Sequence, residues 1–406
     1  MTAVPATTVI VLCRDRTDLA RLTVLALRQQ SLRSFQLVIV SNQVATLRRI
    51  LPDPDRIVFV PFQEANVSAA RNAGIAASCG DVIAFCDDDA VPEPKWLERL
   101  IAPFEDPSIG AVGGVVRGRN GVSLQWGPVA VDRCGEDHPL VIPDDTPVFV
   151  AKPDRARVPK TVGTCCAFRR DALVGIGGFD CAFRFYLDET DVNFRLAAAG
   201  WSTAIVPLAE VHHRFAASAF RTRMRVPTSL FEMSASKAYF CERHCPEPSI
   251  EPAFAAFRTD QRRRLIGFAM LGFLGAADIK RILATMEDGI AEGVTRRPTP
   301  GVFGPPVGGQ SYVSEPAPSH RLILQSLWSR CRAEIAEAVA AGETVTLFDL
   351  RPGTRMMTVR YQEPGLWVHR GGIWGRTDRN EQLFRPRFSS TAITNETERI
   401  AQQRGI

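Results

Sequence analysis

Apolar and polar residues alternate in blocks along the first third of the chain. Short apolar runs that are typical of buried strands are separated by longer segments in which apolar residues recur at helical spacing. The expected strands are 8–12, 35–40, 56–60, 82–86 and 109–116, and the expected helices are 17–30, 46–51, 65–78 and 94–103. This alternation predicts an α/β domain with a parallel sheet and helices on both faces.

The pattern changes after this region. Residues 117–160 are rich in Pro, Asp and Arg and predict a long irregular excursion over the sheet. A strand is expected at 202–211, and helices are expected at 216–243 and 320–341. Three short strands should follow at 344–350, 356–361 and 366–369. We therefore expect an α/β domain at 1–215, a helical extension at 216–297, a Pro/Gly-rich linker at 298–319 and a small α+β module of unassigned role at 320–406.

Composition narrows the class of protein. The 406 residues are 45% hydrophobic and 23% charged, which is an ordinary globular balance. The net charge of +5 is modest and spread out, so it does not indicate a nucleic acid partner. The N-terminal residues lack a signal pattern, and the longest apolar stretch, 265–277, is too short to cross a bilayer. Ten cysteines without a framework spacing predict reduced thiols, and we expect a cytoplasmic protein.

Three consecutive carboxylates, Asp87, Asp88 and Asp89, follow the expected strand 82–86. In an extended strand Asp87 and Asp89 point the same way and Asp88 points the other way. Two carboxylates on one side repel each other unless a cation lies between them, and such ligands suit Mg²⁺ or Mn²⁺. A polar strand end is the simpler alternative, but three acids directly after a buried strand favour a metal and phosphate site.

A second acidic cluster, Asp188, Glu189 and Asp191, opens a helix. Acids in a first helical turn are favoured by the helix dipole, but three in four positions exceed what capping needs. A carboxylate here is a candidate general base. The strand 202–211 then leads to His212 and His213, which face opposite ways, so at most one of them can join a metal site.

Two further segments carry candidate binding residues. Arg71 lies in the first turns of the expected helix 65–78, where it could hold a phosphate or a base edge, or be a solvated side chain. Small residues at 163–167 leave room for a ligand against the backbone. Cys165 and Cys166 within that segment are read as small buried residues rather than nucleophiles, because no base adjoins them.

Over roughly residues 7–245 the chain resembles the family 2 glycosyltransferases with the GT-A fold. The resemblance rests on the order and spacing of several motifs, namely 66–75, 85–92, 163–180, 188–196 and 212–213. It implies a Rossmann-like mixed sheet of the nucleotide-diphospho-sugar transferase type, with the catalytic domain at 1–215. It also implies a nucleotide-sugar donor and a divalent cofactor, Mn²⁺ or Mg²⁺.

The resemblance also implies roles for the donor-binding residues. Asp87 and Asp89 would bind the metal, and Asp88 would support the nucleotide. Arg71 would reach the base or the diphosphate. His212, or His213 if the strand register differs, would be a further metal ligand. After the second strand the family usually has an aspartate that holds the nucleobase, whereas this chain has Ser41 and Asn42, which leaves the nucleotide preference open.

Counting back from Arg195 and Leu196 places the family's catalytic acidic pair on Asp188 and Glu189. Glu189 would be the general base, and Asp191 is the alternative. The implied reaction is inverting transfer of a sugar to a hydroxyl of a glycan, a lipid-linked molecule or another acceptor.

Two other functions stay open. A nucleotidyltransferase that forms a nucleotide-sugar would normally have a Gly-rich basic loop after the first strand, and residues 13–16 contain no glycine. A non-catalytic nucleotide- or glycan-binding relative is favoured only by the Ser41–Asn42 departure.

Two basic segments bear on partners. Arg214, Arg221, Arg223 and Arg225 could guide an acidic or lipid-linked acceptor or form a solvated face. The segment 262–264 precedes the apolar run 265–277 and could mark either a buried helix or peripheral contact at the inner membrane face. The oligomeric state is left open.

Overall fold

The structure is a computed structural model. It describes residues 5–143, 146–151, 156–306, 308–309, 311–312, 319–324, 332–377, 381–382, 384, 386 and 388–404. Among these residues the largest sheet runs in the order β10 (Phe149–Ala151), β13 (Ser202–His213), β6 (Ile109–Arg117), β12 (Cys166–Arg169), β4 (Val82–Asp87), β1 (Thr7–Cys13), β2 (Gln36–Ser41) and β3 (Ile57–Pro61). Two short strands join its flank, β5 (Ala90–Pro92) on β13 and β7 (Leu124–Trp126) on β6.

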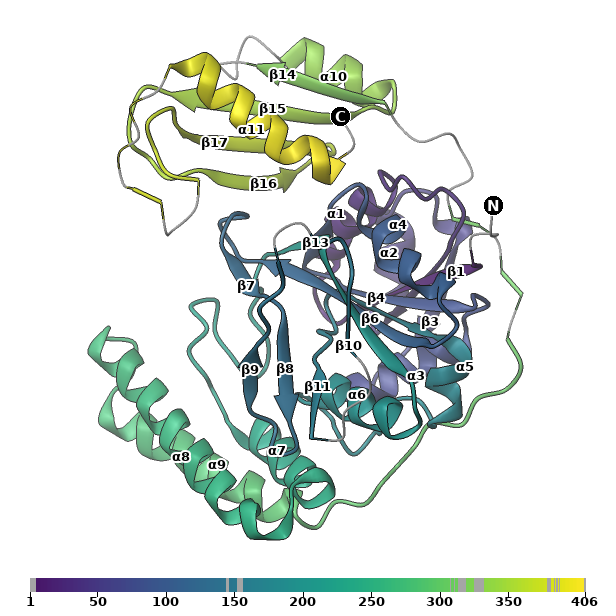
Figure 1. The fold of residues 1–406 in the computed structure, drawn as a ribbon, viewed down its shortest axis with the longest axis vertical. Coiled ribbons are helices and arrows are strands. Elements are labelled where there is room, and N and C mark those ends of the chain that lie inside the picture. The colour runs from purple at the N-terminus through teal and green to yellow at the C-terminus, as the bar shows by residue number, and fades with distance from the viewer. Residues whose placement is uncertain are drawn as a thin grey trace.

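The main sheet is mixed. Strands β4, β1, β2 and β3 are parallel, as the alternating pattern predicted, and β12 runs antiparallel between β4 and β6. The helices that cover the sheet are α1 (Thr17–Leu27), α2 (Val44–Ile50), α3 (Val67–Ala76), α4 (Trp96–Ile101), α5 (Arg170–Gly175) and α6 (Asp188–Ala198). One apolar core holds side chains of α1 and α4, and the other holds side chains of α3, α5 and α6. The α/β class with helices on both faces is therefore confirmed (Figure 1).

The segment 117–160 differs from the expected irregular excursion. Besides β7 and β10 it forms a small antiparallel sheet with the order β11 (Arg157–Pro159), β8 (Val129–Asp132) and β9 (Asp137–Pro139). Val131 and Val158 of this sheet are buried in a core with Phe183 and Phe240. The strands hold only three or four residues each, too few to give a recognisable alternation.

The prediction of a helix over residues 216–243 is wrong for the first half of that range. Helix α7 (Phe231–His244) begins only after an irregular segment that contains Pro227 and two residues with positive φ, Phe215 and Arg225. Helices α8 (Glu247–Met270) and α9 (Ala276–Gly293) then form a hairpin that projects from the α/β domain (Figure 1). A disulfide joins Cys134 to Cys245, which corrects the expectation of reduced thiols at these two positions. Within the described residues, no helix is both long and apolar enough to span a bilayer.

The chain returns from this hairpin along the α/β domain before it enters the C-terminal module. Backbone hydrogen bonds fix this return segment: Cys181 N–H donates to Thr299 O at 2.9 Å, and Tyr312 N–H donates to Phe35 O at 2.7 Å. The Pro/Gly-rich segment expected as a linker thus lies against the domain where it is described. The module contains β14 (His320–Leu324), α10 (Arg332–Ala340), β15 (Thr344–Arg351), β16 (Thr358–Gln362), β17 (Leu366–Gly372) and α11 (Ser389–Arg404).

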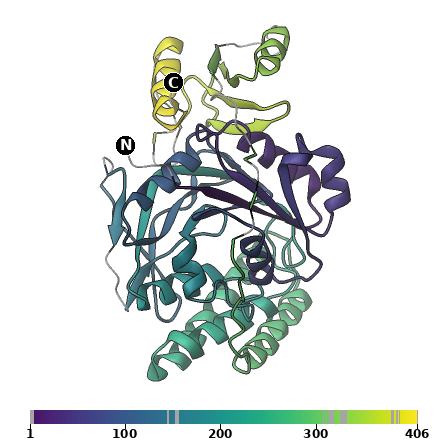
Figure 2. The same ribbon diagram turned by 90° about the vertical axis from the view of Figure 1, so that its right-hand side faces the viewer.

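In its described residues, the C-terminal module is a four-stranded sheet in the order β14-β15-β17-β16 with the helices α10 and α11 (Figure 1). The three expected strands at 344–350, 356–361 and 366–369 are confirmed, but His320–Leu324 is a strand rather than the start of a helix. Residues 325–331 of that expected helix lie outside the described part of the chain. The module sits on the α/β domain (Figure 2), and one apolar core contains Leu22 and Val91 of the domain together with Phe348 and Trp367 of the module.

A buried ion pair anchors the module. Arg404 Nε lies 2.7 Å from Glu93 Oε2, and His212 Nε2 lies 2.8 Å from Glu93 Oε1. The Arg404 guanidinium also covers the ring of Trp367 at 4.3 Å. Burial alone would raise the pKa of Glu93, but Arg404 and His212 hold it well below its usual range. The contact therefore joins a negative charge beside β5 to a positive charge at the end of α11.

We expect Arg404→Ala to lower the free energy of unfolding by about 3–5 kcal/mol, because it leaves the buried Glu93 carboxylate without its cation. Urea unfolding followed by tryptophan fluorescence measures this change. Arg263→Ala is the matched control, because Arg263 is 77% exposed and pairs only with Asp260 three residues earlier. Equal stability of the two variants would show that the ion pair does not anchor the module.

Candidate functional site

The candidate site is a cavity of about 1260 Å³ at the carboxyl ends of the central strands. It is lined by residues that follow β1, β2 and β4, by the start of α3 and of α6, by residues 160–164, and by the segment after β13. Ligands of open α/β sheets bind at this edge because the strand ends and helix starts converge there. Arg71, Asp87, Asp89, Glu189 and His213 all line this one cavity.

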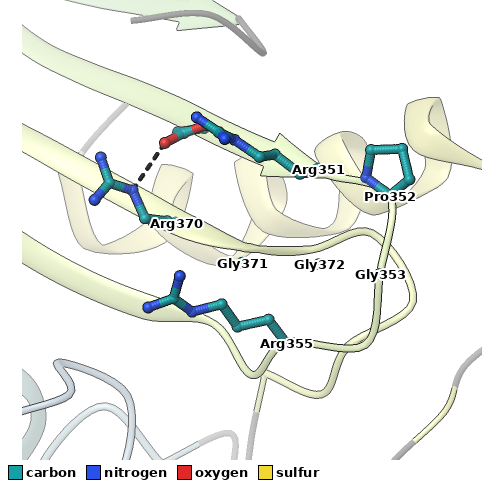
Figure 3. Close-up of a pocket in the computed structure, with 8 residues that line it drawn as sticks. Arg351, Pro352, Gly353, Arg355, Arg370, Gly371 and Gly372 are labelled. Carbon is teal, nitrogen blue, oxygen red and sulfur yellow. Dashed lines mark hydrogen bonds and ion pairs between the residues drawn. The ribbon is translucent and has the colours of Figure 1, made fainter.

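A second, smaller hollow of about 380 Å³ lies in the C-terminal module, between the end of β15 and the end of β17 (Figure 3). Arg351, Arg355 and Arg370 surround its glycine-rich turns, and Asp349 pairs with Arg370 at 2.8 Å. None of the predicted site residues lines this hollow. The larger cavity is therefore the candidate functional site.

Asp87, Asp89 and His213 form a group with metal-ligand geometry. One ligand atom from each residue lies within 4.8 Å of the other two. Strand β4 ends at Asp87 and β5 starts at Ala90, so Asp88 and Asp89 form a turn rather than an extended strand. Asp87 and Asp89 still approach each other, because the turn redirects the Asp89 side chain. Two carboxylate oxygens and one imidazole nitrogen fit Mn²⁺ or Mg²⁺.

Of the two histidines that the sequence left open as a ligand, the structure brings His213, and not His212, to the aspartates. Strand β13 pairs His213 with Ala90, next to Asp89, and His213 Nε2 lies 3.1 Å from Asp89 Oδ1. The other ring nitrogen, Nδ1, lies 2.9 Å from Gln125 Oε1. His212 faces the opposite side of β13, toward Glu93. The prediction that the two histidines point apart therefore holds, and the strand register decides which of them faces the cavity.

Asp88 does not occupy the expected nucleotide-facing position. Its side chain is completely buried and does not line the cavity. Arg16 Nε donates to Asp88 Oδ2 at 3.1 Å, and Arg16 Nη1 lies 3.4 Å from Asp89 Oδ2. Burial raises the pKa of Asp89, but the hydrogen bond with His213 and the charge of Arg16 outweigh burial and hold that pKa well below its usual range.

Arg16 was not among the predicted site residues. It follows β1, which neighbours β4 in the sheet, so the two strand ends bring Arg16 and the aspartates together. Its place after the first parallel strand was the signal that could have found it.

Arg71 holds the second acidic cluster. Its guanidinium forms an ion pair with Asp188, and its Nη2 donates to Glu189 Oε1 at 2.7 Å. The guanidinium is buried beside the ring of Phe179, at 5.0 Å from the ring centroid. Arg71 thus lines the cavity as the partner of two carboxylates, whereas the sequence predicted a contact with the nucleotide.

The two carboxylates that Arg71 contacts have different protonation preferences. Burial raises the pKa of Asp188 above its ordinary value. Burial also raises the pKa of Glu189. The charge of Arg71 and the hydrogen bond with Asp188 outweigh burial and lower the pKa of Glu189 below its ordinary value. The lowered pKa keeps Glu189 ionised near neutral pH, which is the state that a general base requires.

Asp191 is turned away from the cavity. Its carboxylate accepts a hydrogen bond from Arg195 Nε at 2.7 Å and lies 2.8 Å from His244 Nε2. These contacts tie α6 to α7, and Asp191 is fully buried. The position of Asp191 does not support the alternative in which it acts as the base.

Ser41 and Asn42 both line the cavity, at the end of β2. Ser41 Oγ accepts the backbone N–H of Gln43 at 2.9 Å. Asn42 Nδ2 donates to Asp15 Oδ1 at 2.7 Å. Asp15, which sequence reasoning did not select, thus places a carboxylate beside the position where the family usually has an aspartate.

The comparisons with known proteins point to one family. The family model for glycosyl transferase family 2 matches residues 8–177. The match covers β1 to α5 and includes the aspartates that follow β4. This part of the chain is therefore similar to glycosyl transferase family 2, and its mixed sheet agrees with the predicted GT-A class.

Curated relatives carry related names. A pre-mycofactocin glycosyltransferase of Mycobacterium tuberculosis is 31% identical over 36% of this chain and 29% of its own length. The succinoglycan biosynthesis protein ExoM of Rhizobium meliloti is 32% identical over 39% of this chain and 48% of its own length. An uncharacterised protein, y4gI, of Sinorhizobium fredii is 28% identical over 54% of this chain and 25% of its own length. The chain thus spans about a quarter to a half of the length of these relatives.

Among solved structures, a mannosyltransferase from Pyrobaculum calidifontis in complex with GDP-Man and Mn²⁺ aligns with a TM-score of 0.41 and 17% identity. That alignment covers 72% of this chain and 85% of the other chain.

Gly163, in the loop 160–164, packs closely against the side chains of Arg71 and Glu189. A Cβ atom at this position would lie 1.8 Å from Arg71 Nη2 and 2.0 Å from Glu189 Oε1. We expect Gly163→Ala to push this pair apart and to lower the free energy of unfolding by about 1–3 kcal/mol, the usual cost of overpacking. Gly175→Ala is the control, because nothing lies within 4 Å of its added Cβ. Urea unfolding compares the variants, and equal stability would contradict the close approach.

Proposed function

We propose that this protein is a metal-dependent, inverting glycosyltransferase that moves a sugar from a nucleotide-sugar to an acceptor hydroxyl. The observation that carries the proposal is that one cavity of a family 2 domain contains both a candidate metal group and an ionised carboxylate. Asp87, Asp89 and His213 form the metal group, and Glu189 is the carboxylate. The first group suits the donor diphosphate, and the second suits the acceptor hydroxyl.

In this proposal Asp87, Asp89 and His213 hold Mn²⁺ or Mg²⁺. The bound ion would supply Lewis-acid stabilisation of the charge on the leaving nucleoside diphosphate. Glu189 accepts the proton of the acceptor hydroxyl while that oxygen attacks the anomeric carbon of the donor sugar. The bond from the anomeric carbon to the diphosphate breaks as the new bond forms on the opposite side, so the configuration inverts. Arg71 keeps Glu189 ionised and fixes its position.

The names of several relatives agree with transfer to a hydroxyl group, and they refer to different kinds of acceptor molecule. One relative is named a glucosyl-dolichyl phosphate glucuronosyltransferase, from Haloferax volcanii, and ExoM is named for succinoglycan biosynthesis. We therefore propose a glycan or a lipid-linked molecule as the acceptor class. The family match favours this reading over the nucleotidyltransferase.

The donor proposal is tested by thermal unfolding of the full chain with UDP-, GDP- and dTDP-sugars, each with and without Mn²⁺. A nucleotide-sugar at about 100 times its Kd should add roughly 2.7 kcal/mol of stability, and the gain should require the metal. His213→Ala should lose the metal-dependent part of the gain. His138→Ala, a half-exposed histidine beside Asp132, should keep it. A metal-dependent gain that survives in His213→Ala would contradict the ligand set.

The base proposal is tested by Glu189→Gln, which keeps the shape of the side chain but cannot accept the proton. We expect kcat to fall by about 10²–10⁴-fold while Mn²⁺-dependent binding of the nucleotide-sugar is retained. The rate of product formation checks the first part, both as kcat in the steady state and as the rate of a single turnover, and thermal unfolding checks the second. Unchanged transfer by Glu189→Gln would remove Glu189 from the mechanism.

A further inference from the structure

One part of the cavity wall differs in chemical character from the aspartates. The segment that follows β13, the start of α7 and one side of α8 form this part, and they contribute arginines and apolar side chains. The arginines are Arg221, Arg225 and Arg264, and the apolar side chains include Met233 and Phe268. An amphipathic ligand would fit such a surface better than a neutral sugar would.

The three arginines lack carboxylate partners among the described residues. Lys160 and Arg184, which line the same cavity, face Asp137 at 2.8 Å and Glu232 at 3.7 Å respectively. By contrast, no ion pair joins Arg221, Arg225 or Arg264 to an acid in the described part of the chain, and Arg221 Nε is buried without a hydrogen-bond partner.

The charge of Arg221 also acts on the other two arginines. Burial lowers the pKa of Arg225 and of Arg264, and the charge of Arg221 lowers both further. Clustered cations without an ion-pair partner among the described residues favour the binding of an anion that carries more than one charge.

Apolar side chains are also exposed at the tip of the hairpin, next to a residue of the cavity wall. Arg264 and Phe268 are four residues apart on α8, so they share one face of the helix. The ring of Phe268 lies 6.4 Å from the ring of Phe273 in the turn between α8 and α9. At this tip Met270 is 83% exposed and Leu271 is 71% exposed. Exposed apolar side chains that continue from a cavity mark a contact site for an apolar partner.

We propose that this part of the cavity wall binds an acceptor that carries a phosphate or diphosphate on a long apolar chain. The anionic group lies among Arg221, Arg225 and Arg264, and the apolar chain lies along Phe268 toward the tip of the hairpin. The inference rests on the proposed function, because it assigns the acceptor class of the same cavity. The proposed function assigns the donor diphosphate to the metal group of Asp87, Asp89 and His213.

The test uses the full chain in EDTA, so that the metal group cannot hold a diphosphate. Calorimetry measures the binding of three probes: farnesyl diphosphate, farnesol and inorganic pyrophosphate. Farnesyl diphosphate should bind about ten-fold or more tightly than either other probe, because it alone contacts both the arginines and the apolar surface. Equal binding of pyrophosphate would mean a site for free phosphate and would overturn the proposal, and so would no binding of farnesyl diphosphate.

Variants separate this site from the donor site. The double variant Arg221→Gln/Arg264→Gln should weaken the binding of farnesyl diphosphate by about ten-fold or more, because each lost charged hydrogen bond contributes to the affinity on that scale. Arg263→Gln, on the exposed side of α8, is the matched control and should bind the probe as the unchanged chain does.

The same variants are then tested for Mn²⁺-dependent binding of nucleotide-sugar. Retained binding in the double variant supports a separate acceptor site. Loss of that binding would mean that the arginines bind the donor, and it would overturn the inference. If the unchanged chain binds no nucleotide-sugar, the proposed function itself fails, and the farnesyl diphosphate result still reports on the anionic site alone.

Discussion

The alternation of side chains along β13 is the constraint on which the two halves of the molecule depend. Because successive residues of a strand face opposite sides, His213 reaches Asp89 while His212 reaches Glu93. Glu93 in turn is paired with Arg404, the last described residue of α11. One strand end therefore contributes to the candidate metal group on one side and to the docking of the C-terminal module on the other.

Charge balance organises the rest of the cavity. Asp89 has both Arg16 and His213 close by. Glu189 has Arg71, which it shares with the buried Asp188. By contrast, Arg221, Arg225 and Arg264 line the same cavity and form no ion pair with an acid among the described residues. The cavity thus combines paired carboxylates with unpaired arginines.

The sequence predicted most of the α/β domain, because its strands and helices are long enough to show their periodicity. It also predicted that Asp87, Asp89 and one of the two histidines converge, but strand alternation alone could not decide between His212 and His213. That choice depends on the pairing of β13 with β5, a contact between segments about 120 residues apart. The partners of Arg71 and the disulfide of Cys134 could not be predicted for the same reason, because each depends on contacts between distant segments.

The return segment from α9 to the C-terminal module has a consequence for how that module stays in place. Its hydrogen bonds to Cys181 and Phe35 hold it against the α/β domain along its path. Few residues separate Tyr312, which is held to the domain, from β14 of the module, so the module is present at a high effective concentration at its docking surface. If the Arg404 contact opened briefly, rebinding within the same chain would be faster than exchange with a module from another molecule.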